Sequence, residues 1–319
     1  MYQKKLSVKV FITLLLSAIC IFVFQGCKKV QAPFENDGFI TFTDSLGRNV
    51  SVPENTLDAV VLTGSFADVW TLSGGNVTAT VKDAFEDFDL VLPEAVNLGT
   101  VKEPNVELLL KVNPSLVIAS SNTASNMELL PILENVGITV AYFEIATFDD
   151  YLSMLDICTD ITGRKDLYEQ NGISVEKHIA KEKEEFIKKN ISEDEKKYLL
   201  LRASSGFVKA KGSDDYVLGG ILKDLGYVNI ADSDKSLLEN LSIESIIKQN
   251  PGHIFIIQMG DDFDAAKKNI EALFSDNPAW TGLNAVKNRN VHFMEKRLFS
   301  LKPNARWGES YEILTNLLK

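Results

Sequence analysis

The chain has 319 residues, with 33 basic and 44 acidic side chains and a formal net charge of −11 at neutral pH. This balance excludes nucleic-acid binding, which needs a basic surface, because no basic stripe occurs beyond the N-terminal segment. Two of the three cysteines, Cys20 and Cys27, lie in that segment, so Cys158 has no partner for an intramolecular disulfide. Stability must come from packing, and the remaining ~290 residues are enough for two lobes.

The first 27 residues predict a bacterial lipoprotein signal peptide. A lysine-rich start precedes the apolar run 10–24, which is shorter than the ~20 residues that a spanning helix needs. Gly26 is the small residue expected before a lipidated cysteine, so Cys27 is the predicted lipidation site. Cys20 is the alternative, but Ile19 before it suits cleavage less well.

Lipid chains on Cys27 would anchor the protein to the membrane, with residues 28–37 as a short tether. The alternative is an uncleaved N-terminal anchor. In either case residues 28–319 are expected outside the cytoplasm.

Strands and helices alternate through the first half of the folded part. Residues 39–43 and 49–52 alternate in polarity around a turn, which predicts a β-hairpin. Alternation of strands with helices predicts a mainly parallel sheet with helices on both faces. The expected strands cover 59–62, 77–81, 115–119 and 138–143, and the expected helices cover 66–73, 106–113, 125–136 and 148–162.

One long helix is predicted over 165–190. Its apolar residues recur on one face from Tyr168 to Phe186, and Gly172 is its weak point. The strand and helix alternation then resumes. It predicts strands at 198–203, 227–230, 254–257 and 291–294, and helices at 214–225, 243–250, 262–274 and after Pro303.

The predicted fold class is therefore α/β, with two Rossmann-like lobes of mainly parallel sheet. We expect an N-terminal lobe over 38–163, a linking helix over 164–190 and a C-terminal lobe over 191–319. Ligands of open α/β sheets bind at the carboxyl ends of strands, so the loops after the strands should face a cleft.

A short pattern occurs twice, once in each predicted lobe. The stretches 106–114 and 243–251 both form a helix pattern that ends in Asn-Pro and runs into an apolar strand. Glu107 and Glu244 each stand seven residues before the proline, and they lie 137 residues apart. We interpret the pattern as two copies of one folding unit. The alternative is a common helix–strand junction that recurs by chance.

Polar residues after the predicted strands are the candidate ligand contacts. Ser65 and Phe66 offer a hydroxyl, an aromatic face and helix N-terminal amides, although Ser65 could instead be a plain N-cap. The other candidates are Thr100, Lys102, Ser121 and Asn122 in the first lobe, and Arg202, Met259, Arg306 and Trp307 in the second.

Several motifs follow one another in the order found in a known family. They include Thr43-Asp44-Ser45-Leu46-Gly47-Arg48, Gly64-Ser65-Phe66-Ala67-Asp68, Lys211-Gly212-Ser213-Asp214, Asn277-Pro278-Ala279-Trp280 and Lys302-Pro303-Asn304-Ala305-Arg306-Trp307. The chain resembles bacterial ABC-importer substrate-binding proteins of the helix-braced type, which carry iron–siderophores, haem or cobalamin. The resemblance implies capture of a small molecule outside the cytoplasm, limited hinge motion and delivery to a permease dimer with its ATPase.

The resemblance also implies roles for particular residues. Glu107 and Glu244 match the surface glutamates that dock onto permease arginines, although each could simply favour a helix dipole. Arg306 matches a region whose basic side chains bind anionic chelates, although it could instead pair with Glu309. Trp307 beside it could belong to the core.

Other classes of protein find little support. His178, His253 and His292 share no spacing with cysteines or acids that would form a metal cage, and no nucleophile elbow, Walker loop or dinucleotide motif is present. We expect a monomer that is not an enzyme and that carries no cofactor. A sensory or enzymatic lipoprotein of the same fold is the alternative, and a structural lipoprotein that binds nothing is a third. Which ligand is carried does not follow from the sequence.

Overall fold

The computed structural model describes residues 38–260 and 262–318, and Phe39–Lys319 form a unit separate from Met1–Gly38. The predicted signal peptide, the lipidation site Cys27 and the tether 28–37 lie outside the described residues. Across the described residues, no helix combines the length and the apolar character that crossing a membrane requires.

The predicted N-terminal hairpin is present as β1 (Phe39–Thr43) and β2 (Asn49–Pro53), paired antiparallel. Asp44 organises its turn, because its carboxylate accepts the backbone N–H groups of Leu46 and Arg48 at 3.0 Å each. The guanidinium of Arg48 pairs with Asp44 at 2.6 Å and donates to the Val140 carbonyl at 2.9 Å. These bonds attach the hairpin to the edge of the first sheet.

The first lobe is built on a five-stranded sheet in which every pair is parallel, in the order β5-β4-β3-β8-β9. Val60 of β3 faces one apolar cluster, and Ala59 and Val61 face another, so the sheet is buried on both sides. The strands are β3 (Asp58–Val61), β4 (Asn76–Thr80), β5 (Val96–Asn97), β8 (Leu116–Ser120) and β9 (Thr139–Phe143).

Four predicted helices of this lobe are present as α2 (Gly64–Leu72), α4 (Val106–Val112), α5 (Ala124–Asn135) and α6 (Phe148–Thr162). The sequence prediction missed the short helix α3 (Lys82–Glu86) and the hairpin of β6 (Gly99–Thr100) and β7 (Glu103–Pro104). These elements have two to five residues, too few for a helical or alternating pattern to stand out.

The second lobe contains a sheet in the order β11-β10-β13-β14, with β12 beside β10. Only the pair β10–β11 is antiparallel, so the expectation of mainly parallel sheets is confirmed. The strands are β10 (Lys197–Ala203), β11 (Val208–Lys211), β12 (Val228–Asn229), β13 (His253–Gln258) and β14 (Val291–Met294). The longer helices are α9 (Val217–Asp224), α11 (Ile243–Gln249), α12 (Phe263–Asp276) and α15 (Trp307–Leu317).

The remaining helical segments of this lobe are short. They are α10 (Lys235–Asn240), α13 (Asn284–Lys287), α14 (Lys296–Phe299) and the 3₁₀ turns Ser213–Asp215, Pro278–Gly282 and Asn304–Arg306. The helix predicted over 214–225 is therefore divided. Tyr216 adopts extended backbone angles between the 3₁₀ turn and α9.

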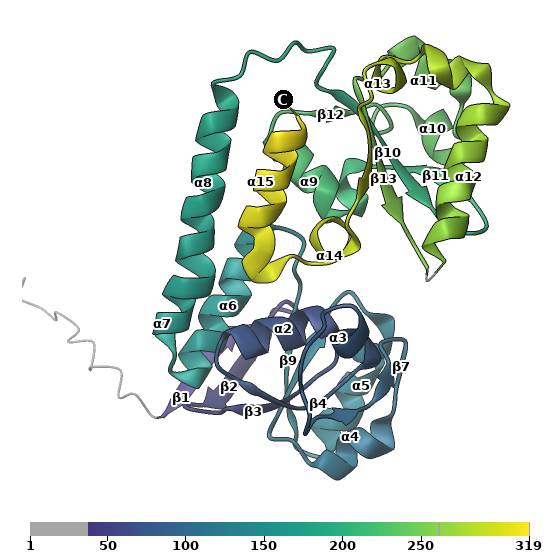
Figure 1. Cartoon of the computed structure of the whole chain (residues 1–319). Helices are drawn as coiled ribbons and strands as arrows, with labels where there is room; N and C mark the ends of the chain where they lie inside the picture. The colour runs from purple at the N-terminus through teal and green to yellow at the C-terminus, as the bar shows by residue number, and fades with distance from the viewer. Residues whose placement is uncertain (1–37, 261, 319) are drawn as a thin grey trace, which may run out of the picture. The chain divides into compact units, whose positions relative to one another are not determined.

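The long helix between the sheets is less regular than predicted. It comprises α7 (Lys165–Tyr168), a π-helical turn (Glu169–Ile173) and α8 (Ser174–Ile187). The π turn contains Gly172, where an added Cβ would lie 3.1 Å from Leu152 of α6, so the irregularity coincides with close packing. Ile179 and Phe186 of α8 are buried as predicted, and α15 runs beside α8 (Figure 1).

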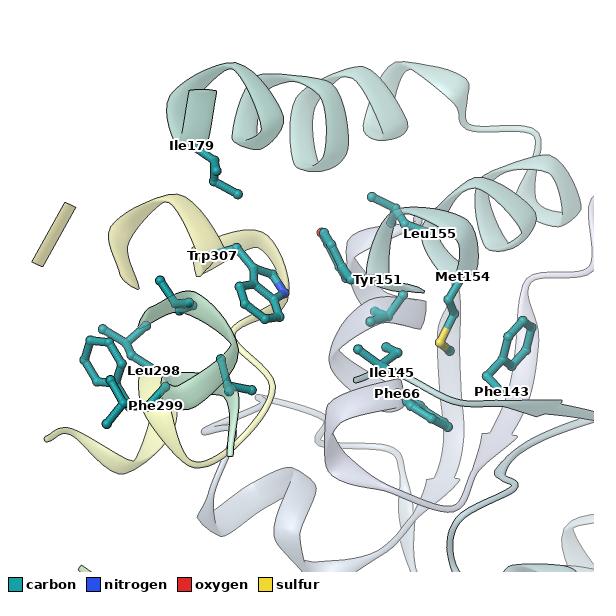
Figure 2. Packing of buried hydrophobic residues seen from close by; sticks show 14 of the residues in the cluster. Phe66, Phe143, Ile145, Tyr151, Met154, Leu155, Ile179, Leu298, Phe299 and Trp307 are labelled. Atoms are coloured by element: carbon teal, nitrogen blue, oxygen red, sulfur yellow. The ribbon is translucent and has the colours of Figure 1, made fainter. Parts of the chain in front are cut away.

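One continuous apolar cluster contains side chains from both sheets and from α8 and α15. Figure 2 shows part of it, with Tyr151 and Leu155 of α6 on one side of Trp307 and Leu298 on the other. Because protein interiors are close-packed, moving one lobe against the other would disturb this cluster. The shared core therefore favours small hinge motions.

Several aromatic rings pack together at the start of the parallel strands of the second sheet, at the end opposite to their carboxyl ends. His253 is 6% exposed, and its ring centroid lies 5.8 Å from that of His292 and 5.7 Å from that of Tyr227. The Nδ1 of His253 and the Nε2 of His292 are buried without hydrogen-bond partners. Burial, and then the nearby His292, lowers the pKa of His253 to about 4, against the opposing effect of Glu195.

We expect these rings to make the protein sensitive to mild acid. A histidine whose pKa is lowered on folding contributes stability that is present above its unfolded pKa and is lost as the pH falls toward its folded pKa. Between pH 7.5 and 5 the free energy of unfolding should fall by about 2 kcal/mol on account of His253. Urea unfolding at both pH values checks this, and His253→Phe should reduce the difference. An unchanged difference in that variant would contradict it.

Candidate ligand-binding cleft

A cavity of about 290 Å³ lies where the carboxyl ends of the first lobe's strands meet the second lobe. The first lobe lines it with Thr63, Ser65, Phe66, Asp83, Phe88, Ser120, Asn122, Thr123, Glu144 and Ile145, and the second lobe with Ser300, Leu301 and Lys302. Its size is near the lower end for small-molecule sites, and its walls combine aromatic rings with hydroxyl, amide and charged groups.

The start of α2 forms one wall of this cavity. Thr63 is the N-cap of α2 and accepts the Phe66 N–H at 3.4 Å, so the alternative that Ser65 is the N-cap is wrong. The Gly64 N–H donates to both oxygens of Asp83 at 3.0 Å. A Cβ on Gly64 would lie 2.7 Å from the Ala84 nitrogen, so glycine permits this approach. Burial raises the pKa of Asp83.

Lys302 is the one cationic residue among those that line the cavity. Among the described residues, none of the ion pairs within 4.0 Å includes it. Burial lowers the pKa of its ammonium group, and the carboxylates of Asp150 and Glu144 act in the opposite direction. A partly buried cation without a direct partner can pair with an anionic group of a ligand.

A polar cluster, which we call the interlobe clamp, joins the lobes beside the cavity. Arg297 of α14 pairs with Asp68 of α2 at 2.7 Å, and each side chain is only 14% exposed. Asn304 donates to Asp68 at 2.8 Å and to the Ser65 carbonyl at 2.9 Å. Burial raises the pKa of Asp68, and the hydrogen bond from Asn304 and the charge of Arg297 act in the opposite direction.

Arg297 also orders the cavity wall directly. Its guanidinium carbon lies 4.3 Å from the centroid of the Phe88 ring. An N–H group of the same guanidinium donates to the Lys302 carbonyl. The Arg297 guanidinium thus contacts the Phe88 ring of the first lobe and the backbone carbonyl of Lys302 in the second lobe.

A second cavity, of about 470 Å³, lies on the other side of Leu301. Its walls include Gln258, at the end of β13, and Lys296, which pairs with Asp87 of the first lobe at 2.5 Å. Leu301 lines both cavities, so the two are adjacent.

The structure brings together three of the predicted ligand contacts, Ser65, Phe66 and Asn122, in the first cavity. Thr100 and Lys102 lie instead at the exposed β6–β7 hairpin, where the Thr100 hydroxyl accepts the Glu103 N–H at 3.2 Å. Ser121 donates to the Phe143 carbonyl at 3.3 Å and does not line the first cavity.

Arg306 and Trp307 lie outside the first cavity too. Arg306 forms a two-pronged ion pair with Glu309, at 2.7 and 2.9 Å, which was the alternative given for it. Trp307 is 3% exposed in the shared core, with its ring 6.0 Å from that of Phe148. It borders a separate groove of about 680 Å³ between α8 and α9.

Arg202 is the second-last residue of β10, and Met259 directly follows the neighbouring strand β13. The Met259 N–H donates to the Ala203 carbonyl at 2.8 Å, and the Met259 sulfur accepts the Ser300 hydroxyl at 3.8 Å. Since Ser300 lines the first cavity, Met259 at the end of β13 lies next to that cavity. Sequence reasoning missed Lys302 and Asp83. Lys302 could have been found as the basic residue directly before Pro303 in a motif already recognised.

The repeated pattern forms two matching helices. Asn105 caps α4 and Ser242 caps α11, each accepting the N–H three residues on, and Asn113 and Asn250 end the helices in the left-handed conformation. The glutamates occupy the same place in the first turn of each helix, and both are exposed. Two surface carboxylates therefore recur in the same local frame, one on each lobe.

The contrast between Lys302 and Arg306 gives a direct test. Lys302→Gln should weaken binding of an anionic ligand about tenfold or more, because it removes the cation from the cavity. Arg306→Gln should change affinity less than threefold, since its exposed guanidinium is already engaged by Glu309. Isothermal titration with both variants decides this. The opposite ranking would make Arg306, rather than Lys302, the main contact with the anion.

The fold and the cleft define a two-lobed α/β binding protein. The family model described as "Periplasmic binding protein" matches residues 59–298. The chain belongs to this family. Its members are binding proteins rather than enzymes, so the resemblance drawn from the motif order and the expectation of a non-enzyme are both confirmed.

Individual relatives agree with this assignment. The iron-uptake system-binding protein of Bacillus subtilis is 24% identical over 271 residues, which cover 82% of this chain and 80% of that protein. The putative ABC transporter substrate-binding lipoprotein YhfQ of the same organism is 25% identical over 282 residues, with coverages of 82% and 83%. The haem-complexed S. aureus IsdE structure superposes with a TM-score of 0.63 at 19% identity, covering 82% of this chain and 98% of that one, and so shares the fold.

Proposed function

We propose that this chain is the extracytoplasmic substrate-binding protein of an ABC importer for an iron complex (siderophore chelate or haem) or for cobalamin. The observation that carries the proposal is the cavity between two α/β lobes, with a cation, hydroxyls and aromatic rings converging from both. Relatives named for iron uptake and for ABC transport, together with the fold shared with a haem-binding protein, support this substrate class.

Attachment to the membrane through lipidated Cys27 is part of the proposal. It is supported by the sequence before Cys27 and by a relative named as a lipoprotein. We propose a monomer whose lobes extend over 38–163 and 191–319, with residues 164–190 as the linking helix. The interlobe clamp and the shared core favour small closing motions in such a protein.

Glu107 and Glu244 are the proposed contacts with the permease. Arginine side chains bind carboxylates with two parallel hydrogen bonds, and a permease dimer can present them in pairs. The matching caps and helix ends of α4 and α11 support equivalent roles for the two glutamates. Delivery of ligand would follow docking, with the ATPase supplying the energy.

Ligand screening by thermal shift and native mass spectrometry tests the substrate class. Purified residues 28–319 would be mixed with ferric siderophores, haem or cobalamin. A ligand at 100 times its dissociation constant adds about 2.7 kcal/mol to the free energy of unfolding, which is easily measured. A screen in which none of these compounds stabilises the protein would remove the proposed substrate class. A sensory role would gain support from binding without any effect on uptake.

A further inference from the structure

A cationic and aromatic cluster lies at the β10–β11 hairpin, outside both cavities described above. We propose that Arg202, Phe207 and Lys209 form a subsite for the part of the ligand that carries negative charge beside a planar conjugated ring. The inference rests on the proposed function and adds the ligand's chemistry to it.

The arrangement of the two cations is costly without a ligand. Arg202 and Lys209 are direct partners in the antiparallel register of β10 and β11, so their side chains leave the same face of the sheet. Like charges directly opposite each other destabilise a strand pair. Among the described residues, neither side chain takes part in an ion pair, and the Nε of Arg202 is buried without a hydrogen-bond partner.

Phe207 lies at the hairpin tip within reach of both cations. Its ring centroid is 5.3 Å from the Arg202 guanidinium carbon and 5.5 Å from the Lys209 ammonium. The side chain is 38% exposed, so part of it is accessible to a ligand.

The cluster adjoins the proposed cleft. Arg202 stands one residue before Ala203, whose carbonyl accepts the Met259 N–H, and Met259 contacts Ser300 of the first cavity. A ligand in the cleft can therefore extend to the hairpin. There an anion would relieve the repulsion between the cations, and a conjugated ring would find Phe207 and the flat guanidinium face of Arg202.

Two kinds of ligand carry negative charge beside a conjugated ring, and experiment can distinguish them. One is a ferric catecholate, and the other is haem with its carboxylates. We would titrate wild type, Lys209→Gln and Phe207→Ala with ferric 2,3-dihydroxybenzoate, with haem and with ferric citrate, an anion that has no ring. We expect wild type to bind one of the two ring-bearing ligands more tightly than ferric citrate. Lys209→Gln should lose about 3- to 10-fold in affinity for it. Phe207→Ala should lose about tenfold for the ring-bearing ligand and less than threefold for ferric citrate.

A second measurement needs no ligand. Lys209→Glu places a carboxylate opposite Arg202, so the melting temperature of the free protein should rise by about 1–3 °C. The exposed Lys177 of α8 gives the matched control, because Lys177→Glu makes the same change in net charge elsewhere. A fall in the melting temperature of Lys209→Glu would show that the opposed cations do not repel, and would overturn the inference.

The outcomes separate the inference from the proposed function. If the wild type binds a ligand tightly and neither hairpin variant changes the affinity, the subsite is overturned and the proposed function stands. A preference of the wild type for ferric citrate over both ring-bearing ligands has the same two consequences. Absence of binding to all iron complexes and to cobalamin overturns the proposed function, and the subsite with it.

Discussion

Replacing Asp68 with alanine is expected to lower the free energy of unfolding by about 3–5 kcal/mol, because the change leaves the buried guanidinium of Arg297 without its counter-charge. The two side chains lie 2.7 Å apart and are each 14% exposed, so water compensates little for the loss. Asn304 would lose its hydrogen bond to the same carboxylate. Urea unfolding monitored by tryptophan fluorescence measures the effect.

A variant that removes both charges separates the effect of an unpaired charge from the loss of the ion pair itself. Asp68→Leu with Arg297→Met removes both charges, and should be less harmful than the Asp68→Ala change alone. The exposed pair Lys82–Glu86 is the control, and Glu86→Ala should cost less than 1 kcal/mol. Equal costs for Asp68→Ala and Glu86→Ala would contradict a stabilising role for the interlobe clamp.

The clamp connects stability with binding. Arg297 holds the Phe88 ring and the Lys302 carbonyl, so its loss should displace both walls of the cavity. A ligand that pairs with Lys302 would then have to order this region itself, which lowers affinity. The same residues that join the lobes thus keep the cleft preorganised for its ligand.

Long periodic elements were predictable from the sequence. The helix α6 was predicted with the observed bounds. The structure shows that Thr147 caps its start with a capping box and that Gly163 ends it in a left-handed conformation. The helix over 165–190 was predicted as continuous, yet it has a π turn at Gly172 where α6 packs closely. The periodicity of apolar residues predicts the helix, whereas the π turn depends on packing against α6, which lies elsewhere in the sequence.

The site was less predictable, since it depends on contacts between distant residues. The motif at 302–307 was recognised, and Arg306 was named from it as a candidate ligand contact, whereas Lys302 was not. The ion pair between Arg306 and Glu309, three residues later, could be predicted from the sequence, and the structure contains it. That Lys302 would line a cavity with Ser65 and Asn122 could not be read from the sequence, because those residues lie 237 and 180 positions before it. The clamp pair Asp68 and Arg297 was hidden for the same reason.

Reversing both Glu107 and Glu244 to lysine is expected to abolish most uptake while leaving ligand affinity unchanged. Both side chains are exposed in the first turns of α4 and α11, and neither lines the cavities of the cleft. If the permease presents arginines to both, each new lysine replaces an attraction with a repulsion. Like-charge contacts at an interface cost several kcal/mol, far more than the ~1 kcal/mol of an exposed ion pair.

Reconstituted uptake, with ligand binding measured in parallel, tests this expectation. The matched control is Glu128→Lys with Glu271→Lys, which makes the same change in net charge at exposed positions of α5 and α12. Single reversals of Glu107 or Glu244 should reduce uptake to similar extents, because the two helices have the same caps and the same helix ends. Wild-type uptake by the double variant would mean that these glutamates only favour the helix dipoles. The repeat would then record the common origin of the two lobes rather than a docking surface.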